Sequence, residues 1–337
     1  MLRVALVGAG GMAGMHAGCY AGIPNADLVG VMDVRPEAAQ ALAGKHGAQP
    51  YSDFDRMLTE TRPDVVDVCC PTPWHVDYVC AAAERAGELG LRGISTEKPM
   101  ALAQDDCERM IAAADRADIP LFVAHVVRFF PEFLAAKRAV EAGEVGQPAA
   151  IRTRRGGPMP RGWEDWYGKP EMSGGCILDL IIHDFDWLRW TFGEVERVTA
   201  CGLSGRQLPG FDYALVTLRF ASGAIGHVEG TWADPGGFKV SIEIAGDAGL
   251  LEYNANQPSG TPFRMALYGG DGPRANVVVP ESPMDYNPYQ AELQHFIDSL
   301  EQGVRPSISP QDGLEAVRIG LAAIESIETG QPVILRA

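Results

Sequence analysis

A short glycine turn near the start of the sequence constrains the fold more than any other feature. The apolar run over residues 2–7 leads directly into the turn Gly8–Ala13 (GAGGMA), and a helical pattern follows over residues 11–22. A strand, a tight turn and a helix in this order open a βαβ unit. The first glycine makes the turn, the second lets backbone approach a pyrophosphate, and Ala13 is small enough for helix–strand packing. The turn therefore predicts a parallel sheet with phosphate bound at a helix N-terminus.

An acidic residue at the end of the second predicted strand points to the ligand. Asp33 closes the apolar run over residues 28–33 and lies 20 positions after Ala13. A carboxylate there accepts hydrogen bonds from the adenosine ribose of a dinucleotide and repels a 2′-phosphate, which favours NAD over NADP. Arg35, two positions on, can contact a 2′-phosphate and keeps NADP open. The alternative is that Asp33 only opens a turn before Pro36, but strand, turn, helix and acid occur here in the expected sequence.

The pattern of apolar residues and turn signals changes about a third of the way along the sequence. Short apolar runs alternate with helical patterns as far as about residue 122, which is typical of a doubly wound parallel sheet. Strands separated by turn signals then predict antiparallel pairing, over residues 149–154, 195–202, 213–220, 224–232, 239–245 and 249–254. Helices are expected over residues 174–190, 288–302 and 310–329. The predicted class is α/β, with a domain built on a parallel sheet over 1–122 and a mixed α+β domain over 123–337.

Composition excludes some classes of protein. The 337 residues carry a formal net charge of −16, which argues against nucleic acid or an anionic membrane as the main partner. The seven cysteines are odd in number and form no C-x-x-C pair, so free thiols in a reducing compartment are expected. Neither a signal peptide nor an apolar run of about 20 residues is recognisable. We expect a cytoplasmic enzyme without a metal.

Two groups of polar residues can carry chemistry. Lys98 follows the strand expected over residues 93–96, at the strand end where doubly wound sheets bind ligands. Asp179 and His183 are spaced i and i+4 in the apolar helix expected over residues 174–190, so they share a face. A carboxylate there can orient the imidazole, which then accepts a proton near neutral pH. The alternatives are a solvated surface lysine and a hydrogen-bonded Asp–His pair in the core.

Taken together, these residues resemble the Gfo/Idh/MocA family of oxidoreductases. Similar segments occur in family order over nearly the whole chain: Gly8–His16, Pro71–His75, Glu97–Ala101, Arg128-Phe129, Gly143–Pro148, and Gly174-Gly175 with Asp179 and His183. The third glycine of the turn is replaced by Ala13, and the stretch over residues 88–93 is longer than usual. The Lys-Pro and Asp-x-x-x-His signals are specific in combination, whereas the glycine turn alone is not.

The resemblance implies a mechanism and a site. Lys98 and His183 would flank the hydroxyl that is oxidised, with Asp179 close by, and the Lys98–Pro99 peptide would be cis. Residues 72–75 would border the nicotinamide. The resemblance also implies a Rossmann domain over 1–122 and, over 123–337, a domain with a large, mostly antiparallel open sheet, which would form the contacts of a homodimer or homotetramer. The expected activity is an NAD(P)-dependent dehydrogenase that transfers hydride between nicotinamide and a hydroxyl of a sugar or an inositol-like polyol.

The site residues fall into three sets. The catalytic candidates are Lys98, Asp179 and His183. The candidates for cofactor binding are Gly8, Gly10, Gly11, Met12, Ala13, Asp33, Arg35, Pro71, Thr72, Trp74, His75, Glu97 and Lys98. The candidates for substrate binding are His125, Arg128, Trp163, Trp166, Tyr167 and His183. Some of the last set have structural alternatives, with Trp166 and Tyr167 as packing residues and Arg128 as a salt-bridge partner.

Two rival interpretations remain open from the sequence. Cys176, Asp179 and His183 are spaced i, i+3 and i+7 and would ligate zinc in a metal-dependent dehydrogenase, although no second ligand cluster supports that site. A non-catalytic NAD-binding sensor would use the same fold, but such relatives tend to lose the residues that handle the proton. Lys98, Asp179 and His183 are all present, which favours an enzyme.

Overall fold

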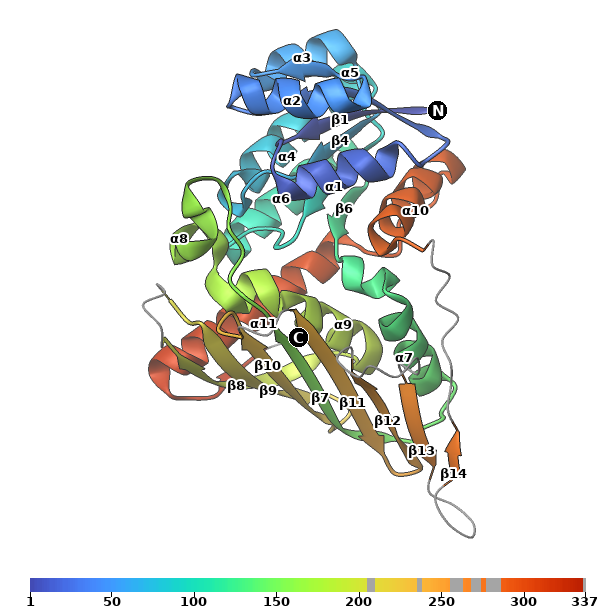
Figure 1. The fold of residues 1–337 in the computed structure, drawn as a ribbon, viewed down its shortest axis with the longest axis vertical. Helices are drawn as coiled ribbons and strands as arrows, with labels where there is room; N and C mark the ends of the chain where they lie inside the picture. The colour runs from blue at the N-terminus through green and yellow to red at the C-terminus, as the bar shows by residue number, and fades with distance from the viewer. Residues whose placement is uncertain (205–209, 235–237, 255–262, 268–273, 277–285, 336–337) are drawn as a thin grey trace. The chain divides into compact units, whose positions relative to one another are not determined.

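The chain folds into two compact units, each with its own sheet (Figure 1). The computed structural model describes residues 1–204, 210–234, 238–254, 263–267, 274–276 and 286–335. Unit 1 contains Met1–Val126, Gly162–Trp166 and Asn287–Val317, and unit 2 contains Val127–Arg161, Tyr167–Tyr286 and Arg318–Ala337. The sequence suggested one crossover near residue 122, whereas two later segments also belong to unit 1.

Unit 1 is built on a six-stranded parallel sheet, as the glycine turn predicted. Its strand order is β3-β2-β1-β4-β5-β6. The strands are β1 (Leu2–Val7), β2 (Ala26–Met32), β3 (Gln49–Tyr51), β4 (Val65–Val68), β5 (Gly93–Glu97) and β6 (Leu121–Ala124). The helices are α1 (Gly11–Tyr20), α2 (Pro36–His46), α3 (Phe54–Thr61), η1 (Thr72–Trp74), α4 (His75–Glu84), α5 (Ala86–Leu89), α6 (Gln104–Ala117) and α10 (Pro288–Gln302).

The central strands of unit 1 are buried because helices cover both faces of the sheet. All four residues of β4 and all five of β5 are buried. Helix α10, far away in the sequence, completes this core: Phe296 stacks on Phe122 of β6 with ring centroids 4.9 Å apart. A Cβ at Gly93 would lie 2.9 Å from Leu300, so β5 has no side chain where α10 packs. The carboxyl ends of the parallel strands meet at one edge, where this fold binds ligands.

Unit 2 contains a nine-stranded sheet in the order β14-β13-β12-β11-β7-β10-β9-β8-β15. Its strands are β7 (Pro148–Gly156), β8 (Val195–Leu203), β9 (Tyr213–Phe220), β10 (Ile225–Thr231), β11 (Lys239–Gly246), β12 (Gly249–Asn254), β13 (Phe263–Leu267), β14 (Arg274–Asn276) and β15 (Val333–Ile334). Among the described strands of this second sheet, β7 and β10 pair in parallel and all other neighbours pair antiparallel. The predicted large, mostly antiparallel sheet is therefore confirmed.

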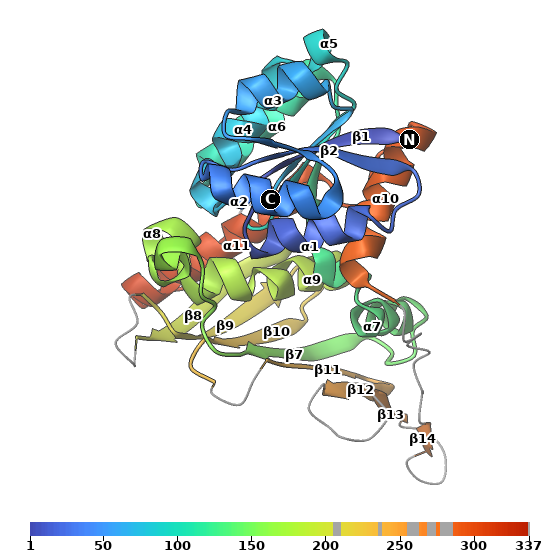
Figure 2. The same cartoon turned by 45° about the horizontal axis from the view of Figure 1, so that its top comes forward.

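One face of this sheet is covered by α7 (Pro131–Glu141), η4 (Cys176–Leu180) and α9 (Ile182–Phe192) (Figure 2). The chain also forms η2 (Val126–Phe129), η3 (Trp163–Gly168), α8 (Pro170–Ser173) and α11 (Pro310–Thr329), and of these η2, η3 and α11 are shared with unit 1. Alternate residues of β9, from Ala214 to Phe220, are buried on the helical side. Trp187 of α9 meets Phe133 of α7 edge to face and donates its indole N–H to the Phe133 carbonyl at 3.1 Å.

The helix predicted over residues 174–190 is not continuous, and that expectation was wrong. Residues Cys176–Leu180 form a π-helical turn, Ile181 is the junction, and the α-helix proper runs over Ile182–Phe192. Gly174 and Gly175 both have left-handed backbone, with φ of 73° and 67°, and so separate this turn from α8. None of the helices described in either unit is both long and apolar enough to cross a membrane.

Candidate active site

The glycine turn provides a bare backbone surface at the end of β1. Gly8 has φ of +105°, and a Cβ there would lie 2.7 Å from the Cys69 carbonyl oxygen, so no larger residue fits. A Cβ at Gly10 or Gly11 would meet no atom within 4 Å. The turn is therefore packed on its inner side and open on its outer side. This open backbone fits the pyrophosphate of a dinucleotide.

The N-terminus of α1 adds electrostatic attraction for that pyrophosphate. Gly10 is the N-cap and makes no side-chain hydrogen bond, and the first turn carries no acidic residue. The N–H groups of a helix's first turn have no partner within the helix, and the helix dipole favours an anion there. Met12 and Ala13 lie in this turn as expected, and Ala13 is fully buried against the sheet.

Asp33 follows β2 at the same edge of the sheet and already accepts several hydrogen bonds. Its Oδ2 accepts from the Ala9 N–H at 2.8 Å, and its Oδ1 accepts from the Arg35 N–H at 2.9 Å. The Arg35 guanidinium donates to Oδ1 from Nε at 3.0 Å and to Oδ2 from Nη2 at 3.2 Å. Burial alone would raise the pKa of Asp33, but the bonds from Arg35 and Ala9 outweigh it and lower the pKa. Asp33 is therefore a carboxylate at neutral pH.

Lys98 follows β5 at this edge as well. The peptide between Lys98 and Pro99 is cis, as the resemblance implied. The Lys98 backbone N–H donates to Glu97 Oε2 at 3.0 Å, and the Lys98 side chain is partly exposed. Glu97 itself is buried, so its carboxylate fixes the backbone that carries Lys98.

The segment after β4 is tied to the Lys98 turn by His75. This buried imidazole has Nδ1 3.0 Å from the Pro99 carbonyl oxygen and Nε2 2.8 Å from the Cys70 carbonyl oxygen. Burial lowers the pKa of His75. Thr72 is also buried, whereas Trp74 is one of the more exposed aromatic side chains. His75 thus holds two loops together, and a direct contact of residues 71–75 with the nicotinamide stays a prediction.

A buried polar network beneath the turn was not anticipated from the sequence. His16 of α1 has Nδ1 2.8 Å from Asp67 Oδ2 and Nε2 3.1 Å from Glu97 Oε1. Tyr20 donates its hydroxyl to Asp67 at 2.9 Å, and Cys69 Sγ lies 3.2 Å from His16 Nδ1. Burial alone would lower the pKa of His16, but Cys69 and Asp67 raise it well above the ordinary value. The available signal was Asp67 itself, a charged residue inside the apolar strand VVDV.

This network is better explained as an ion-paired core than as a metal site. One ligand atom from each of His16, Asp67 and Cys69 lies within 4.8 Å of the others, the one such group among the residues described. Both His16 nitrogens already face carboxylates, an arrangement that satisfies an imidazolium with two N–H donors. The described residues do not bring Cys176, Asp179 and His183 together as metal ligands, so the geometry does not support the zinc alternative.

In unit 2, Asp179 and His183 lie on either side of the break between the π-helical turn and α9. Asp179 is 7% exposed and His183 is partly exposed. Ser173 anchors the start of this turn: its hydroxyl donates to the Tyr167 carbonyl at 2.9 Å and accepts from the Gly175 N–H at 3.1 Å. π-Helical turns of this kind recur at functional sites.

Two buried ion pairs fix the rest of α9. Arg128 donates to Asp186 from Nε at 2.8 Å and from Nη2 at 2.5 Å, and its guanidinium also lies over Trp190. Arg155 donates to Asp184 at 2.7 Å. Arg128 is only 4% exposed, which supports the salt-bridge interpretation of this residue, and its contact with substrate stays a prediction.

The other substrate candidates are divided between the units. His125, Trp163 and Trp166 belong to unit 1, and Tyr167 and His183 belong to unit 2. His125 is fully buried, and Trp166 and Tyr167 are partly exposed. Trp163 lies against Arg35, its ring centroid 5.2 Å from the guanidinium carbon. The structure thus groups Trp163 with a cofactor candidate.

Comparisons with known proteins agree with this geometry. A family model described as an oxidoreductase family with an NAD-binding Rossmann fold matches residues 2–125, and the GFO/IDH/MocA C-terminal domain matches residues 133–252. Myo-inositol 2-dehydrogenase of Thermotoga maritima is 32% identical over 99% of this chain and 98% of its own length. The NAD⁺-dependent scyllo-inositol 2-dehydrogenase of Bacillus subtilis is 28% identical over 99% of this chain and 96% of its own length.

A solved structure supports the same assignment. The crystal structure of a probable dehydrogenase from Thermotoga maritima superposes with a TM-score of 0.83 at 31% identity, covering 99% of this chain and 98% of that one. The resemblance noted in the sequence is therefore confirmed over both units. The chain belongs to the GFO/IDH/MocA family and is an NAD-binding oxidoreductase that acts on CH–OH groups.

Proposed function

We propose that this enzyme interconverts a secondary hydroxyl and a ketone on a sugar or an inositol-like polyol. The observation that carries the proposal is the open backbone of Gly10 and Gly11 at the N-terminus of α1, with Asp33 at the end of the neighbouring strand. That arrangement suits a dinucleotide, and the named relatives act on inositols. Bound NAD would supply the hydride acceptor, and the protein must then position the substrate and take up its proton.

The proton of the substrate hydroxyl is assigned to His183, with Lys98 and Asp179 in supporting roles. His183 would accept the proton of the substrate hydroxyl, since an imidazole titrates near neutral pH. Lys98 would stabilise the developing alkoxide through its ammonium group. Asp179 would orient the imidazole or adjust its charge. The fixed backbone of Lys98, bonded through Glu97 to His16, supports a positioned ammonium.

We assign the substrate contacts to side chains that suit a sugar ring. His125, Arg128, Trp166 and Tyr167 are the candidates, because aromatic faces and hydrogen-bonding side chains suit sugar rings. The ion pair of Arg128 with Asp186 favours a supporting role for that residue. Trp163 is considered separately because of its contact with Arg35.

A substrate panel tests the activity. Purified enzyme is incubated with NAD⁺ and a set of inositols, aldoses and other polyols, and NADH formation is followed at 340 nm. We expect turnover on at least one cyclic polyol or sugar. Tight NAD⁺ binding without turnover on any of them would contradict the dehydrogenase proposal and favour the alternative, a sensor that binds NAD without catalysis.

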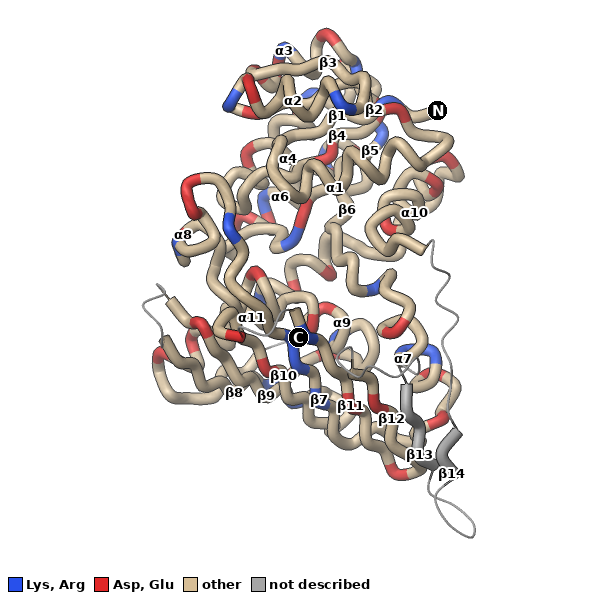
Figure 3. The backbone as a smooth tube through the Cα atoms, in the orientation of Figure 1, with Lys and Arg blue, Asp and Glu red and all other residues tan. Residues whose placement is uncertain are grey.

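We also propose that the enzyme is a cytoplasmic homo-oligomer that associates through the sheet of unit 2. All seven cysteines are free thiols, which fits a reducing compartment. Residues on the face of the sheet away from α7 and α9 include Leu203 and Leu215, which are 65% and 40% exposed. Figure 3 shows both signs of charge on these strands, and Arg154 donates to Glu229 across β7 and β10 at 3.1 Å. An interface on this face would cover the two leucines and leave the charged residues at its polar rim.

A further inference from the structure

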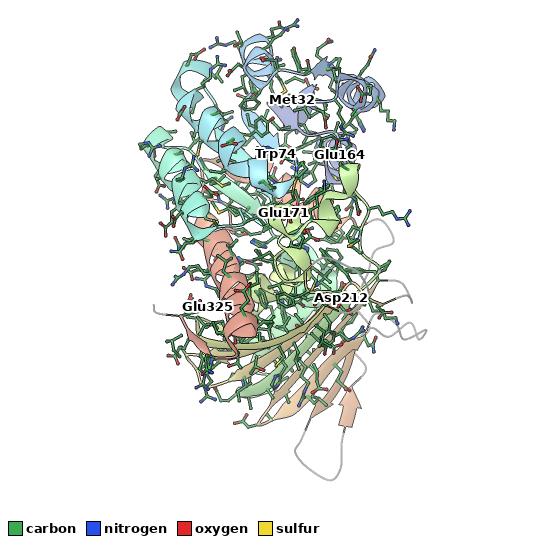
Figure 4. The ribbon with its side chains drawn as sticks, turned by 90° about the vertical axis from the view of Figure 1, so that its left-hand side faces the viewer. Met32, Trp74, Glu164, Glu171, Asp212 and Glu325 are labelled. Carbon is green, nitrogen blue, oxygen red and sulfur yellow. The ribbon has the colours of Figure 1, made fainter. Side chains whose placement is uncertain are left out.

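A short segment between β7 and α8 belongs to unit 1. Residues Gly162–Trp166 are part of unit 1, although the chain on either side of them belongs to unit 2. Within this segment Glu164 and Asp165 have left-handed backbone, with φ of 51° and 53°. That conformation costs roughly 1–2 kcal/mol for a residue with a side chain, and such strain is often retained at functional sites. Figure 4 labels Glu164, together with Met32 at the end of β2.

The strained segment places one aromatic ring against Arg35, a candidate for cofactor binding. Trp163 immediately precedes the two strained residues, and its ring centroid lies 5.2 Å from the guanidinium carbon of Arg35. The ring is 41% exposed, although a tryptophan usually gains from burial. A cation over an indole face is attracted by about 0.5–1 kcal/mol at an exposed site. Trp163 therefore restrains Arg35 from one side.

Asp33 also restrains Arg35, through two hydrogen bonds from the guanidinium, and this has a consequence for the cofactor. The carboxylate accepts four hydrogen bonds, from the N–H groups of Ala9 and Arg35 and from two nitrogens of the Arg35 side chain. A carboxylate offers about four acceptor positions. Ribose hydroxyls can therefore bind Asp33 only if they displace the guanidinium of Arg35.

A 2′-phosphate would meet different conditions at the same place. The guanidinium has five N–H groups, and Asp33 takes only two of them, so others remain to bind phosphate oxygens. The pairing with Arg35 also compensates the negative charge of Asp33 that would otherwise repel a phosphate. Glu37, in the first turn of α2, is the other acidic neighbour of Arg35.

We propose that Arg35, held between Asp33 and Trp163, is a movable selector that lets this site accept the 2′-phosphate of NADP as well as the ribose hydroxyls of NAD. The inference rests on the proposed placement of the dinucleotide at the end of β1. It assigns Trp163 to the adenosine end of the cofactor, where it sets the position of Arg35, and removes it from the substrate contacts.

Binding of cofactor fragments tests the selector without any turnover. ADP-ribose and its 2′-phosphorylated form lack the nicotinamide, so their dissociation constants can be measured by titration calorimetry on the full-length protein. For the wild type we expect the two constants to agree within about tenfold. Arg35→Ala should weaken the phosphorylated ligand by about tenfold or more, while ADP-ribose binds as tightly as before or more tightly, because Asp33 is released.

The tryptophan variants separate a positioning role from a merely structural one. Trp163→Ala should shift the ratio of the two constants in the same direction as Arg35→Ala, and Trp163→Phe should preserve it because the aromatic face is kept. In the double variant the two effects should not add, since both act through the guanidinium. An unchanged ratio in Trp163→Ala, or equal weakening of both ligands, would overturn the selector. Failure of the wild type to bind either ligand would instead contradict the dinucleotide site itself, and the selector with it.

Discussion

At the scale of single residues, the glycine turn separates a folding requirement from a binding requirement. Gly8→Ala places a Cβ 2.7 Å from the Cys69 carbonyl oxygen at a φ of +105°, so we expect a loss of about 2 kcal/mol or more in the free energy of unfolding. Gly10→Ala meets no atom within 4 Å and has an ordinary φ of −84°, so its stability should change little. Its methyl group would occupy the space of the pyrophosphate and weaken NAD⁺ binding by about tenfold or more.

Urea unfolding and calorimetric titration of the two variants measure these effects separately. Gly44→Ala, at an exposed position inside α2, is the matched control. It should raise the free energy of unfolding by about 0.5–1 kcal/mol through helix propensity and leave NAD⁺ binding unchanged. A Gly10→Ala protein that binds NAD⁺ as tightly as the wild type would contradict the proposed position of the pyrophosphate.

The residues that the sequence predicted best are those set by local geometry. Gly8, Ala13 and Asp33 lie where a strand–turn–helix unit requires them, because their roles depend on neighbours a few positions away. The contacts that the sequence did not predict join distant segments. Trp163 meets Arg35 over 128 positions of sequence, and no spacing rule links them.

At the scale of elements, the network that joins α1, β4 and β5 predicts a particular pH dependence of stability. The pKa of His16 is raised, so its contribution is full below its unfolded pKa of about 6.5 and is lost as the pH rises through the folded value. The pKa values of Asp67 and Glu97 are lowered despite burial, so their contributions are present above about pH 4 and are lost below it. Burial raises the pKa of Cys69 and of Tyr20, which adds to the loss at alkaline pH.

Replacing the histidine tests this network. His16→Gln removes the cation between two buried carboxylates and should cost about 3–5 kcal/mol near pH 6. The difference in unfolding free energy between wild type and variant should shrink as the pH rises above neutrality. His46→Gln, at the end of α2, is the control. Parallel stability curves for wild type and His16→Gln between pH 5 and pH 9 would show that His16 is not charged in the folded state.

Helices and strands were predicted best where apolar and polar residues recur with a regular period. Strands such as β9 and β12 were predicted with the bounds that the structure shows, because alternating burial marks them clearly. Strand β3 was missed because it is three residues long and contains Pro50 at the sheet edge. Helices α3 and α7 were also missed, although Asp53 and Pro131 mark their starts. The π-helical turn before α9 has no periodicity signal, since its residues are apolar throughout except Asp179.

At the scale of the whole molecule, the exposed face of the large sheet predicts the oligomeric state. Leu215 lies on β9 and is 40% exposed beside Glu229 of β10. If this face is the subunit interface, Leu215→Lys buries an unpaired charge there and should shift the protein towards the monomer. Light scattering coupled to size-exclusion chromatography measures the mass. Val304→Lys in unit 1, at a site 52% exposed, is the control, and an unchanged mass in Leu215→Lys would argue against this interface.

The parallel sheet and the antiparallel sheet could both be predicted from the sequence, because each has its own pattern of apolar residues. Short apolar runs alternate with helical patterns in the first, and strands separated by turn signals follow one another in the second. It did not predict that α10 and residues 162–166 join unit 1, since these assignments depend on tertiary packing such as Phe296 on Phe122. The roles of Lys98, Asp179 and His183 were inferred from residue spacing and from the family resemblance. The central prediction about function is that these three side chains handle the substrate proton.

The most direct test of that claim is the turnover of Lys98→Met and His183→Ala on the best substrate of the panel, at saturating NAD⁺ and across pH 6–10. We expect kcat to fall by about a hundredfold or more in each variant, while the dissociation constant of NAD⁺ changes little. We also expect the pH dependence of kcat in His183→Ala to lose an ionisation that the wild type shows. Near-normal kcat in both variants would contradict the assignment of the proton to these two side chains.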